Sequence, residues 1–124
     1  MYEVFINFYD LSQGMAKNIS MALVGKQFDG IWHTGICVYN KEFYYGGGIS
    51  WDRPGMTPFG KPTKQMSIGF TDIPEDLFME FLRENRHEWS MDRYHVFEHN
   101  CNHFTFAAGE FLVGDGAVTR EAID

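Results

Sequence analysis

The sequence predicts an α+β fold in which a small antiparallel sheet packs against helices. Short runs rich in β-branched and aromatic residues predict the strands, and a tight connection between two of them indicates a hairpin. Longer segments with apolar residues at helical spacing predict the helices. The chain has 124 residues, of which 44% are hydrophobic and 17% aromatic. We therefore expect one folded domain that spans residues 1–124.

The strands are predicted in this order. Residues 3–9 form the first strand, and residues 32–39 form the second, which Asn40 and Lys41 connect tightly to a third at residues 42–45. The glycines at 46–48 interrupt the pattern and residues 49–51 resume it. Residues 52–64 hold three of the four prolines and predict a loop, and residues 65–70 predict a further strand.

Three segments have helical patterns. Residues 15–24 predict a helix that ends at Gly25. Asp72 is predicted as the N-cap of a second helix, whose apolar stripe consists of Leu77, Phe78, Phe81, Leu82 and Trp89. After a short strand or an extended entry at 94–97, a third helix is expected to begin near Cys101 and to end near Gly114. Its buried face is predicted to comprise Phe104, Ala107, Ala108 and Phe111. The tail shows no clear pattern.

Charge and hydropathy exclude several classes of function. A net charge of −7 argues against nucleic-acid binding. No apolar run approaches the roughly 20 residues that a membrane span requires. Because the N-terminal residues read as a strand and not as a signal peptide, we expect a cytoplasmic location, which could extend to the nucleus. Both cysteines, Cys37 and Cys101, are then expected to be reduced.

The stretch from His99 to His103 offers the clearest candidate for chemistry. Cys101 is predicted at a helix N-terminus, where free N–H groups and the helix dipole favour an anion, so we expect its thiol to lose a proton easily. His33 at the start of a strand provides a candidate base, and Cys37 reads as a buried small hydrophobe. A helix-terminal cysteine with a histidine on a strand is the arrangement that a cysteine hydrolase needs.

Other residues are candidates for supporting roles. Trp32 could shield the imidazole, the N–H of Cys101 could bind an oxyanion, and Asn100, Asn102 and Gly47 are candidates for oxyanion or groove contacts. His103 is expected to point away from the thiol, since two helical residues lie about 200° apart. His99 stays open as an alternative base, whereas His87 and His95 have no motif around them.

A metal site is the competing interpretation, because four potential soft-metal ligands fall within a short stretch: His95, His99, Cys101 and His103. No CxxC pair accompanies them, and a helix that begins at Cys101 would separate the thiol from His103. We therefore expect no metal and no cofactor. Residues 46–48 lack the spacing of a phosphate-binding loop, which excludes nucleotide binding. For these glycines the end of a hairpin is at least as good an interpretation as the border of a groove.

Five segments, in order, resemble one known family. They are residues 9–12 (YDLS), 30–34 (GIWHT), 44–49 (YYGGGI), 54–57 (PGMT) and 99–102 (HNCN). Together they resemble the PPPDE family of desumoylating-isopeptidase-like (DeSI-like) proteins, from about residue 4 to residue 114. The resemblance implies a permuted papain-like cysteine peptidase fold with histidine before cysteine. It also implies His33 as general base and Cys101 as nucleophile.

The resemblance implies a thiol isopeptidase that cleaves conjugates of SUMO- or ubiquitin-like modifiers. A protein S-acyl thioesterase is an alternative, since both reactions pass through an acyl-thioenzyme. A catalytically idle module that binds a ubiquitin-like modifier is a further alternative. The expected partners are modifier conjugates, and a homodimer is left open.

Overall fold

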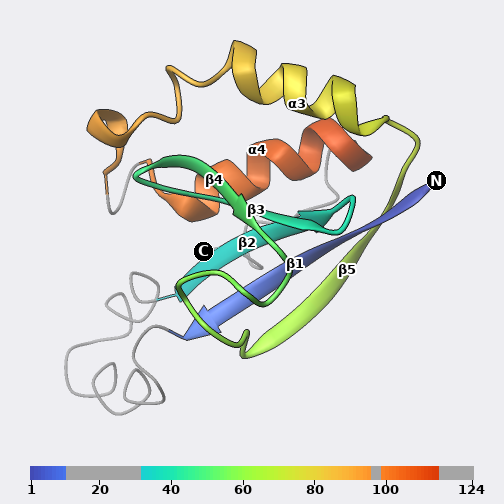
Figure 1. Cartoon of the computed structure of the whole chain (residues 1–124), viewed down its shortest axis with the longest axis horizontal. Coiled ribbons are helices and arrows are strands. Elements are labelled where there is room, and N and C mark those ends of the chain that lie inside the picture. The colour runs from blue at the N-terminus through green and yellow to red at the C-terminus, as the bar shows by residue number, and fades with distance from the viewer. Residues whose placement is uncertain (11–31, 96–98, 115–124) are drawn as a thin grey trace.

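The computed structural model describes residues 1–10, 32–95 and 99–114. The α+β class is confirmed: an antiparallel sheet in the order β4-β3-β2-β1-β5 carries two helices, α3 and α4, on one side (Figure 1). The strands are β1 (Tyr2–Asp10), β2 (Trp32–Val38), β3 (Lys41–Gly46), β4 (Gly48–Asp52) and β5 (Lys64–Thr71). The helices are α3 (Glu75–Glu84) and α4 (Cys101–Val113), with a short 3₁₀ helix at Met91–Arg93. The predicted helix at 15–24 and the tail lie outside the described residues.

Strand alternation gives the sheet two distinct faces. β1 pairs with β2 so that Phe8 lies opposite Thr34 and Tyr9 lies opposite His33. Because successive side chains point to opposite faces, Thr34 and His33 must also face opposite ways. The face that carries Val4, Ile36 and Phe43 packs against the helices, whereas the other face carries the side chains of His33 and Tyr9.

Two tight turns connect β2, β3 and β4. The predicted turn at Asn40 and Lys41 is displaced by one residue. Tyr39 and Asn40 adopt φ values of 56° and 60°, and Lys41 already pairs with Val38. Two left-handed residues are what a two-residue turn needs to follow the twist of the strands. In the second turn Gly46 pairs with Gly48, so these glycines do end a hairpin, as one of the two interpretations of residues 46–48 expected.

Helix α4 begins at Cys101, as predicted, because Asn100 caps it. The Asn100 side chain accepts hydrogen bonds from the backbone N–H groups of Asn102 and His103, and the His103 ring accepts one from the Asn100 N–H. These contacts satisfy N–H groups that the helix itself leaves unpaired. The helix ends before Gly114, and Phe104 and Ala108 are fully buried.

The predicted start of α3 is wrong. The helix begins at Glu75, and its N-cap is Pro74, not Asp72. A residue that precedes proline is disfavoured in the α conformation, so Ile73 cannot form the first turn. The Ile73 N–H instead binds the Thr71 hydroxyl at 3.1 Å. Two members of the predicted stripe also differ: Leu77 is exposed, and Trp89 is buried but lies beyond the helix end.

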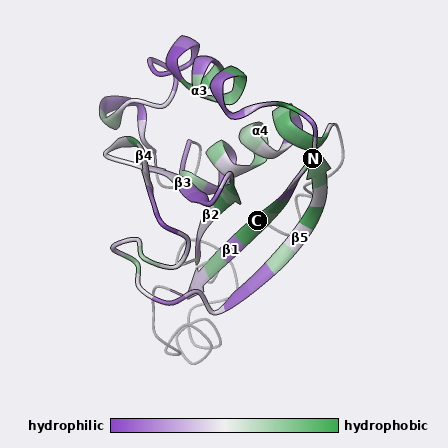
Figure 2. Cartoon of the chain, turned by 45° about the vertical axis from the view of Figure 1, so that its right-hand side comes forward, coloured by the Kyte–Doolittle hydropathy of each residue, from purple (hydrophilic) through white to green (hydrophobic). Residues whose placement is uncertain are grey.

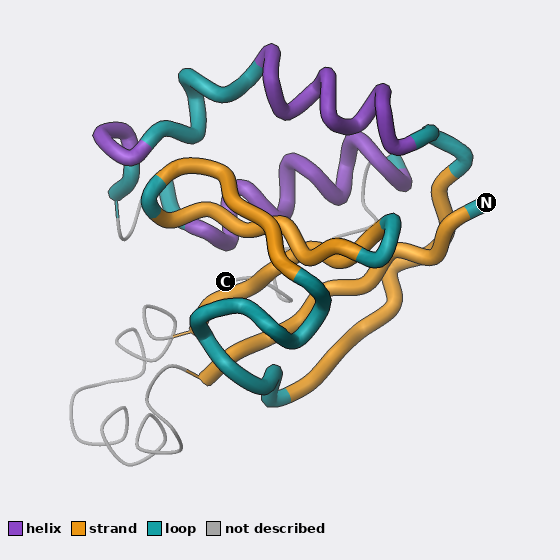
Figure 3. The backbone as a smooth tube through the Cα atoms, in the orientation of Figure 1, coloured by secondary structure: helices purple, strands orange, loops and turns teal. Residues whose placement is uncertain are grey.

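The main core lies between the sheet and the helices. Phe78 of α3 packs against Phe43 of the sheet, and Phe81 stacks on Phe111 of α4 at 4.1 Å between ring centroids. Figure 3 shows both helices on the same side of the sheet, and Figure 2 shows hydrophobic residues along β1 and at the C-terminal end of α4. Within the described residues, no helix is long and apolar enough to cross a membrane.

Candidate active site

Cys101 is the first residue of α4, and its thiol lies against the start of β2. The side chain is buried, with 4% of its surface exposed. Backbone N–H groups of Thr34, Asn102 and Cys101 itself face the sulfur, as does the hydroxyl of Tyr94. The thiol also lies 3.7 Å from Oδ1 of Asn102. Hydrogen-bond donors from three segments therefore converge on one sulfur atom.

The expected easy ionisation of Cys101 is wrong for this arrangement. Burial raises the pKa of the thiol, and the hydrogen bonds from Thr34 and Tyr94 lower it by less. A buried anion loses its hydration, and the helix N-terminus compensates only in part. The resting group is therefore a protonated thiol that already has donors in place for a developing negative charge.

His33 occupies the opposite face of the sheet, beneath an aromatic cover. Its ring stacks on Phe59 with 3.7 Å between centroids and lies close to the rings of Tyr9 and Tyr44. Only 2% of its surface is exposed, and burial lowers its pKa from 6.5 to about 4. Among the described residues its Nε2 is the one buried side-chain nitrogen or oxygen without a hydrogen-bond partner. A buried polar atom left unpaired often marks a functional group.

The structure brings the backbones of the two candidates together, but not their side chains. No hydrogen bond joins the His33 imidazole to the Cys101 thiol in the described residues. The neighbouring Thr34 links the two segments: its hydroxyl donates to Oδ1 of Asn102 at 2.7 Å and lies 3.0 Å from the Thr105 hydroxyl. The start of β2 is thus tied to the first turn of α4.

The other histidines near Cys101 have structural contacts. Nε2 of His99 lies 2.6 Å from the carbonyl oxygen of Glu88, and its ring stacks on Trp89. The His103 ring completes the helix cap. These contacts weaken the case for His99 as the base. The described residues contain no group of three or more His, Cys, Asp or Glu side chains placed to hold a metal ion.

The remaining candidates have mixed outcomes. Asn100 is occupied as the helix cap, and Oδ1 of Asn102 accepts from Thr34, so both have defined structural roles. Gly47 forms the exposed tip of the hairpin. Trp32 begins β2, but its side chain lies outside the described part. Sequence reasoning missed Tyr94 and Phe59, which contact Cys101 and His33 from distant loops without any local motif.

Sequence reasoning also missed a buried polar cluster around Glu42 on the face of the sheet that carries His33. The Glu42 carboxylate is fully buried and accepts from Asn7 at 2.9 Å, from Tyr9 at 2.5 Å and from the Gly55 N–H at 2.9 Å. A Cβ on Gly35 would collide with this carboxylate, so the close approach requires glycine. The hydrogen bond from Gly55 to Glu42 holds the loop that contains Phe59 against the sheet, and Phe59 stacks on His33.

Replacement of Glu42 should destabilise the protein strongly. Glu42→Ala leaves two buried donors, Asn7 and Tyr9, and the half-buried Gly55 N–H without an acceptor, and each buried loss costs about 1–3 kcal/mol. We expect a free energy of unfolding lower by about 3 kcal/mol, measured by urea denaturation. Glu80→Ala on the exposed surface of α3 is the control and should leave the midpoint unchanged. An equal effect of the two substitutions would contradict the role of the cluster.

The burial of His33 predicts a specific loss of stability in acid. Between pH 4 and 6.5 His33 binds a proton in the unfolded chain but stays neutral in the folded chain. The free energy of unfolding therefore falls as the pH drops through this window. The contribution is on the order of 3 kcal/mol at most. In His33→Gln the free energy of unfolding in urea should differ less between pH 4.5 and pH 7 than in wild type. His87→Gln, at an exposed position, should keep the wild-type difference. Identical profiles for both variants would be incompatible with a neutral, buried His33.

The two thiols should differ in reactivity. Donors face Cys101, whereas burial and the Glu42 carboxylate raise the pKa of Cys37. We expect iodoacetamide to modify Cys101 before Cys37, and more slowly than it modifies a free thiol, because both side chains are buried. Peptide mass spectrometry after labelling at pH 6.5 and 8.5 measures the order. Preferential labelling of Cys37 would count against the site.

Fold and site together define a class: an α+β domain with a cysteine at a helix N-terminus, surrounded by hydrogen-bond donors and packed on an antiparallel sheet. The family model described as the PPPDE putative peptidase domain matches residues 2–119. Desumoylating isopeptidase 1 of Xenopus laevis is 43% identical over 108 residues, which cover 86% of this chain and 64% of the relative. The chain belongs to the PPPDE family.

Two further relatives show how far the similarity extends. Human desumoylating isopeptidase 1 is 41% identical over 116 residues, which cover 92% of this chain and 69% of the relative. A DeSI-like protein of Arabidopsis thaliana is 29% identical over 108 residues, covering 82% of this chain and 46% of that protein. The chain therefore spans about two thirds of the length of these animal relatives.

Proposed function

We propose that this protein is a cysteine-type isopeptidase that removes SUMO-like modifiers from lysine side chains. The observation that carries the proposal is the convergence of donors from Thr34, Asn102 and Tyr94 on the sulfur of Cys101. Donors aimed at one atom are suited to stabilise a thiolate and the oxyanion that forms beside it. The relatives named as desumoylating isopeptidases support the choice of substrate.

In the proposed reaction, His33 takes the proton from Cys101 as the sulfur attacks the carbonyl carbon of the modifier's C-terminal glycine. The tetrahedral intermediate collapses when the carbon–nitrogen bond breaks, and His33 returns the proton to the departing lysine amine. Water then attacks the thioester with His33 as base, which releases the carboxylate and the free thiol. Because the His33 side chain lies on the face of the sheet away from α4, this reaction needs the start of β2 to rearrange when substrate binds, so that the imidazole leaves Phe59 and reaches the thiol.

One observation favours a second candidate. The thiol is protonated and buried, and the imidazole is not hydrogen-bonded to it, which also suits a catalytically idle module that binds a ubiquitin-like modifier. An S-acyl thioesterase would use the same acyl-thioenzyme. The isopeptidase proposal includes three further points. We propose that the protein acts in the cytoplasm and the nucleus, that it also acts on ubiquitin conjugates, and that it forms a homodimer.

Three reporters separate these functions. In each reporter a fluorescent group is attached to the C-terminal glycine of a modifier. The first is SUMO with an isopeptide bond to a labelled lysine, the second is ubiquitin with an isopeptide bond to the same lysine, and the third is SUMO with an acyl thioester bond to the label. We expect turnover of the SUMO isopeptide, with slower turnover of the ubiquitin reporter. Cleavage of the thioester alone would favour a thioesterase. Saturable SUMO binding without cleavage of any reporter would establish the idle module and overturn the proposal.

A further inference from the structure

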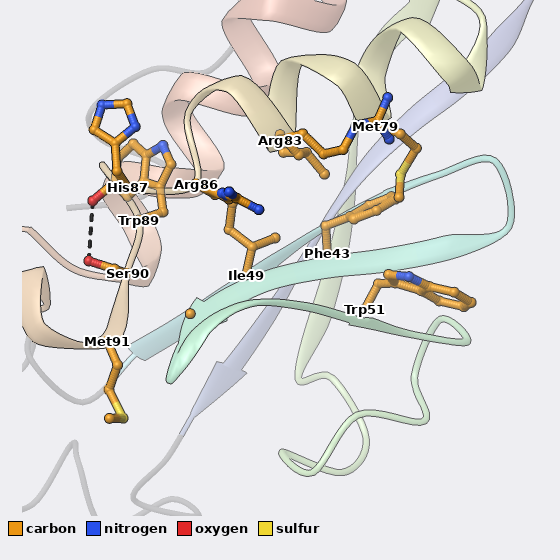
Figure 4. A pocket seen from close by; sticks show the side chains of 12 residues that line it. Phe43, Ile49, Trp51, Met79, Arg83, Arg86, His87, Trp89, Ser90 and Met91 are labelled. Atoms are coloured by element: carbon orange, nitrogen blue, oxygen red, sulfur yellow. Dashed lines mark hydrogen bonds between the residues drawn. The ribbon is translucent and has the colours of Figure 1, made fainter.

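A groove of about 570 Å³ lies between the edge strand β4 and helix α3 with the segment that follows it. Its floor is apolar and includes Phe43, Ile49, Leu82 and Trp89. Figure 4 shows side chains from the β-hairpin and from the α3 region around the same space. Neither Cys101 nor His33 lines the groove, so it is separate from the candidate active site.

Large apolar side chains at this groove are open to solvent. Trp51 is 48% exposed at one end and Met91 is 71% exposed at the other. Both line the groove together with its apolar floor. Exposed apolar surface that is continuous with a groove is typical of a site that a partner covers.

The charges around the groove have one sign. Arg83 and Arg86 are the charged residues that line it, and no acidic residue does. The ion pairs within the described part of the chain use other cations, such as Lys41 with Glu75 and Arg93 with Glu88. The two guanidinium groups at the groove therefore lack an ion-paired carboxylate within the described part of the chain. In a protein of net charge −7 this local excess of positive charge is suited to an acidic partner.

The strand beside the groove has an available backbone edge. β4 ends the sheet and pairs only with β3 in the described residues. Ile49 and Trp51 are two positions apart, so they share one face of the strand, and both line the groove. An extended chain that pairs with such an edge gains main-chain hydrogen bonds and places alternate side chains on one surface.

We propose that this groove docks an extended acidic segment of a partner protein, which adds to β4 as a further strand. Its apolar side chains cover Ile49 and Trp51, and its carboxylates meet Arg83 and Arg86. The docking site is independent of peptidase chemistry, because binding there requires neither Cys101 nor His33.

A peptide-binding experiment tests this site directly. The probe is a fluorescein-labelled decapeptide of alternating valine and glutamate, and fluorescence anisotropy reports its binding to the intact protein. We expect saturable binding that weakens as salt rises. The double variant R83E/R86E should bind at least about tenfold more weakly, whereas K61E, a charge reversal at an exposed position away from the groove, should bind like wild type.

Two further measurements separate strand addition from simple charge attraction. A probe with an N-methyl group on every residue cannot donate main-chain hydrogen bonds along either edge and should lose binding, although its charge is unchanged. R83Q/R86Q removes charge while keeping long side chains, and its thermal melt checks that the fold survives. Equal binding of the N-methylated probe, of a valine–lysine probe or by R83Q/R86Q would overturn the proposal, as would the absence of binding.

Discussion

Cys101→Ala should abolish cleavage of a SUMO isopeptide reporter, with the rate lower by about 10³-fold or more, as is usual when a nucleophile is removed. The reason is chemical: the thiol of Cys101 is the nucleophile that the N–H groups of Thr34 and Asn102 and the Tyr94 hydroxyl contact, and the thiol of Cys37 lies on the other face of the sheet. The fold should persist, because alanine favours helix and the thiol fills little volume. Steady-state turnover measures the rate, and a thermal melt of the same sample measures whether the fold persists.

Cys37→Ala is the matched control. Cys37 is equally buried, with 4% of its surface exposed, but it lies in β2 on the face that carries Glu42. We expect this variant to keep its turnover number even if its stability falls. Retention of more than about a tenth of the wild-type rate by folded Cys101→Ala would remove the nucleophile from the mechanism.

Substitution of His33 should reduce the rate by a similar order, and combining it with Cys101→Ala should add little further loss. Groups that act in one step are strongly non-additive, because the second substitution removes a function that has already been lost. His33→Gln is the sharper variant, since alanine would leave a cavity beneath Phe59. The four turnover numbers of wild type, both single variants and the double variant form a double-mutant cycle.

Additive losses across this cycle would show that the two residues act independently. Full activity of folded His33→Gln would eliminate His33 as the base. His99 would then be the next histidine to test, although its Nε2 is already within hydrogen-bond distance of the Glu88 carbonyl oxygen.

The elements of the fold were predictable where local signals decide them. The β-branched and aromatic residues of 3–9, the alternation in 32–39 and the helical spacing of apolar residues after Cys101 each specify an element through a local signal. The start of α3 was not predicted, because an N-cap preference at Asp72 competes with the restriction that Pro74 imposes on Ile73. The N-cap preference of Asp72 and the backbone restriction before Pro74 favour different starting residues, and the backbone restriction determines where the helix begins.

The candidate site was predictable only in part. The position of Cys101 at a helix start follows from nearby residues, but the pKa of its thiol depends on burial that the whole fold creates. The hydrogen bonds of Glu42 join residues up to 35 positions apart in the sequence, and a local sequence pattern cannot predict contacts between such distant residues. The same holds for Phe59 over His33 and for Tyr94 beside the thiol, which require the loops to be in place.

The central claim, that Cys101 is the nucleophile of an isopeptidase, is tested most directly with a SUMO probe whose C-terminal glycine carries an electrophile. Intact mass should show one probe per chain, and peptide mapping should place the bond at Cys101, with labelling retained in Cys37→Ala and lost in Cys101→Ala. Absence of labelling in folded wild-type protein, or a bond to any other residue, would contradict the account.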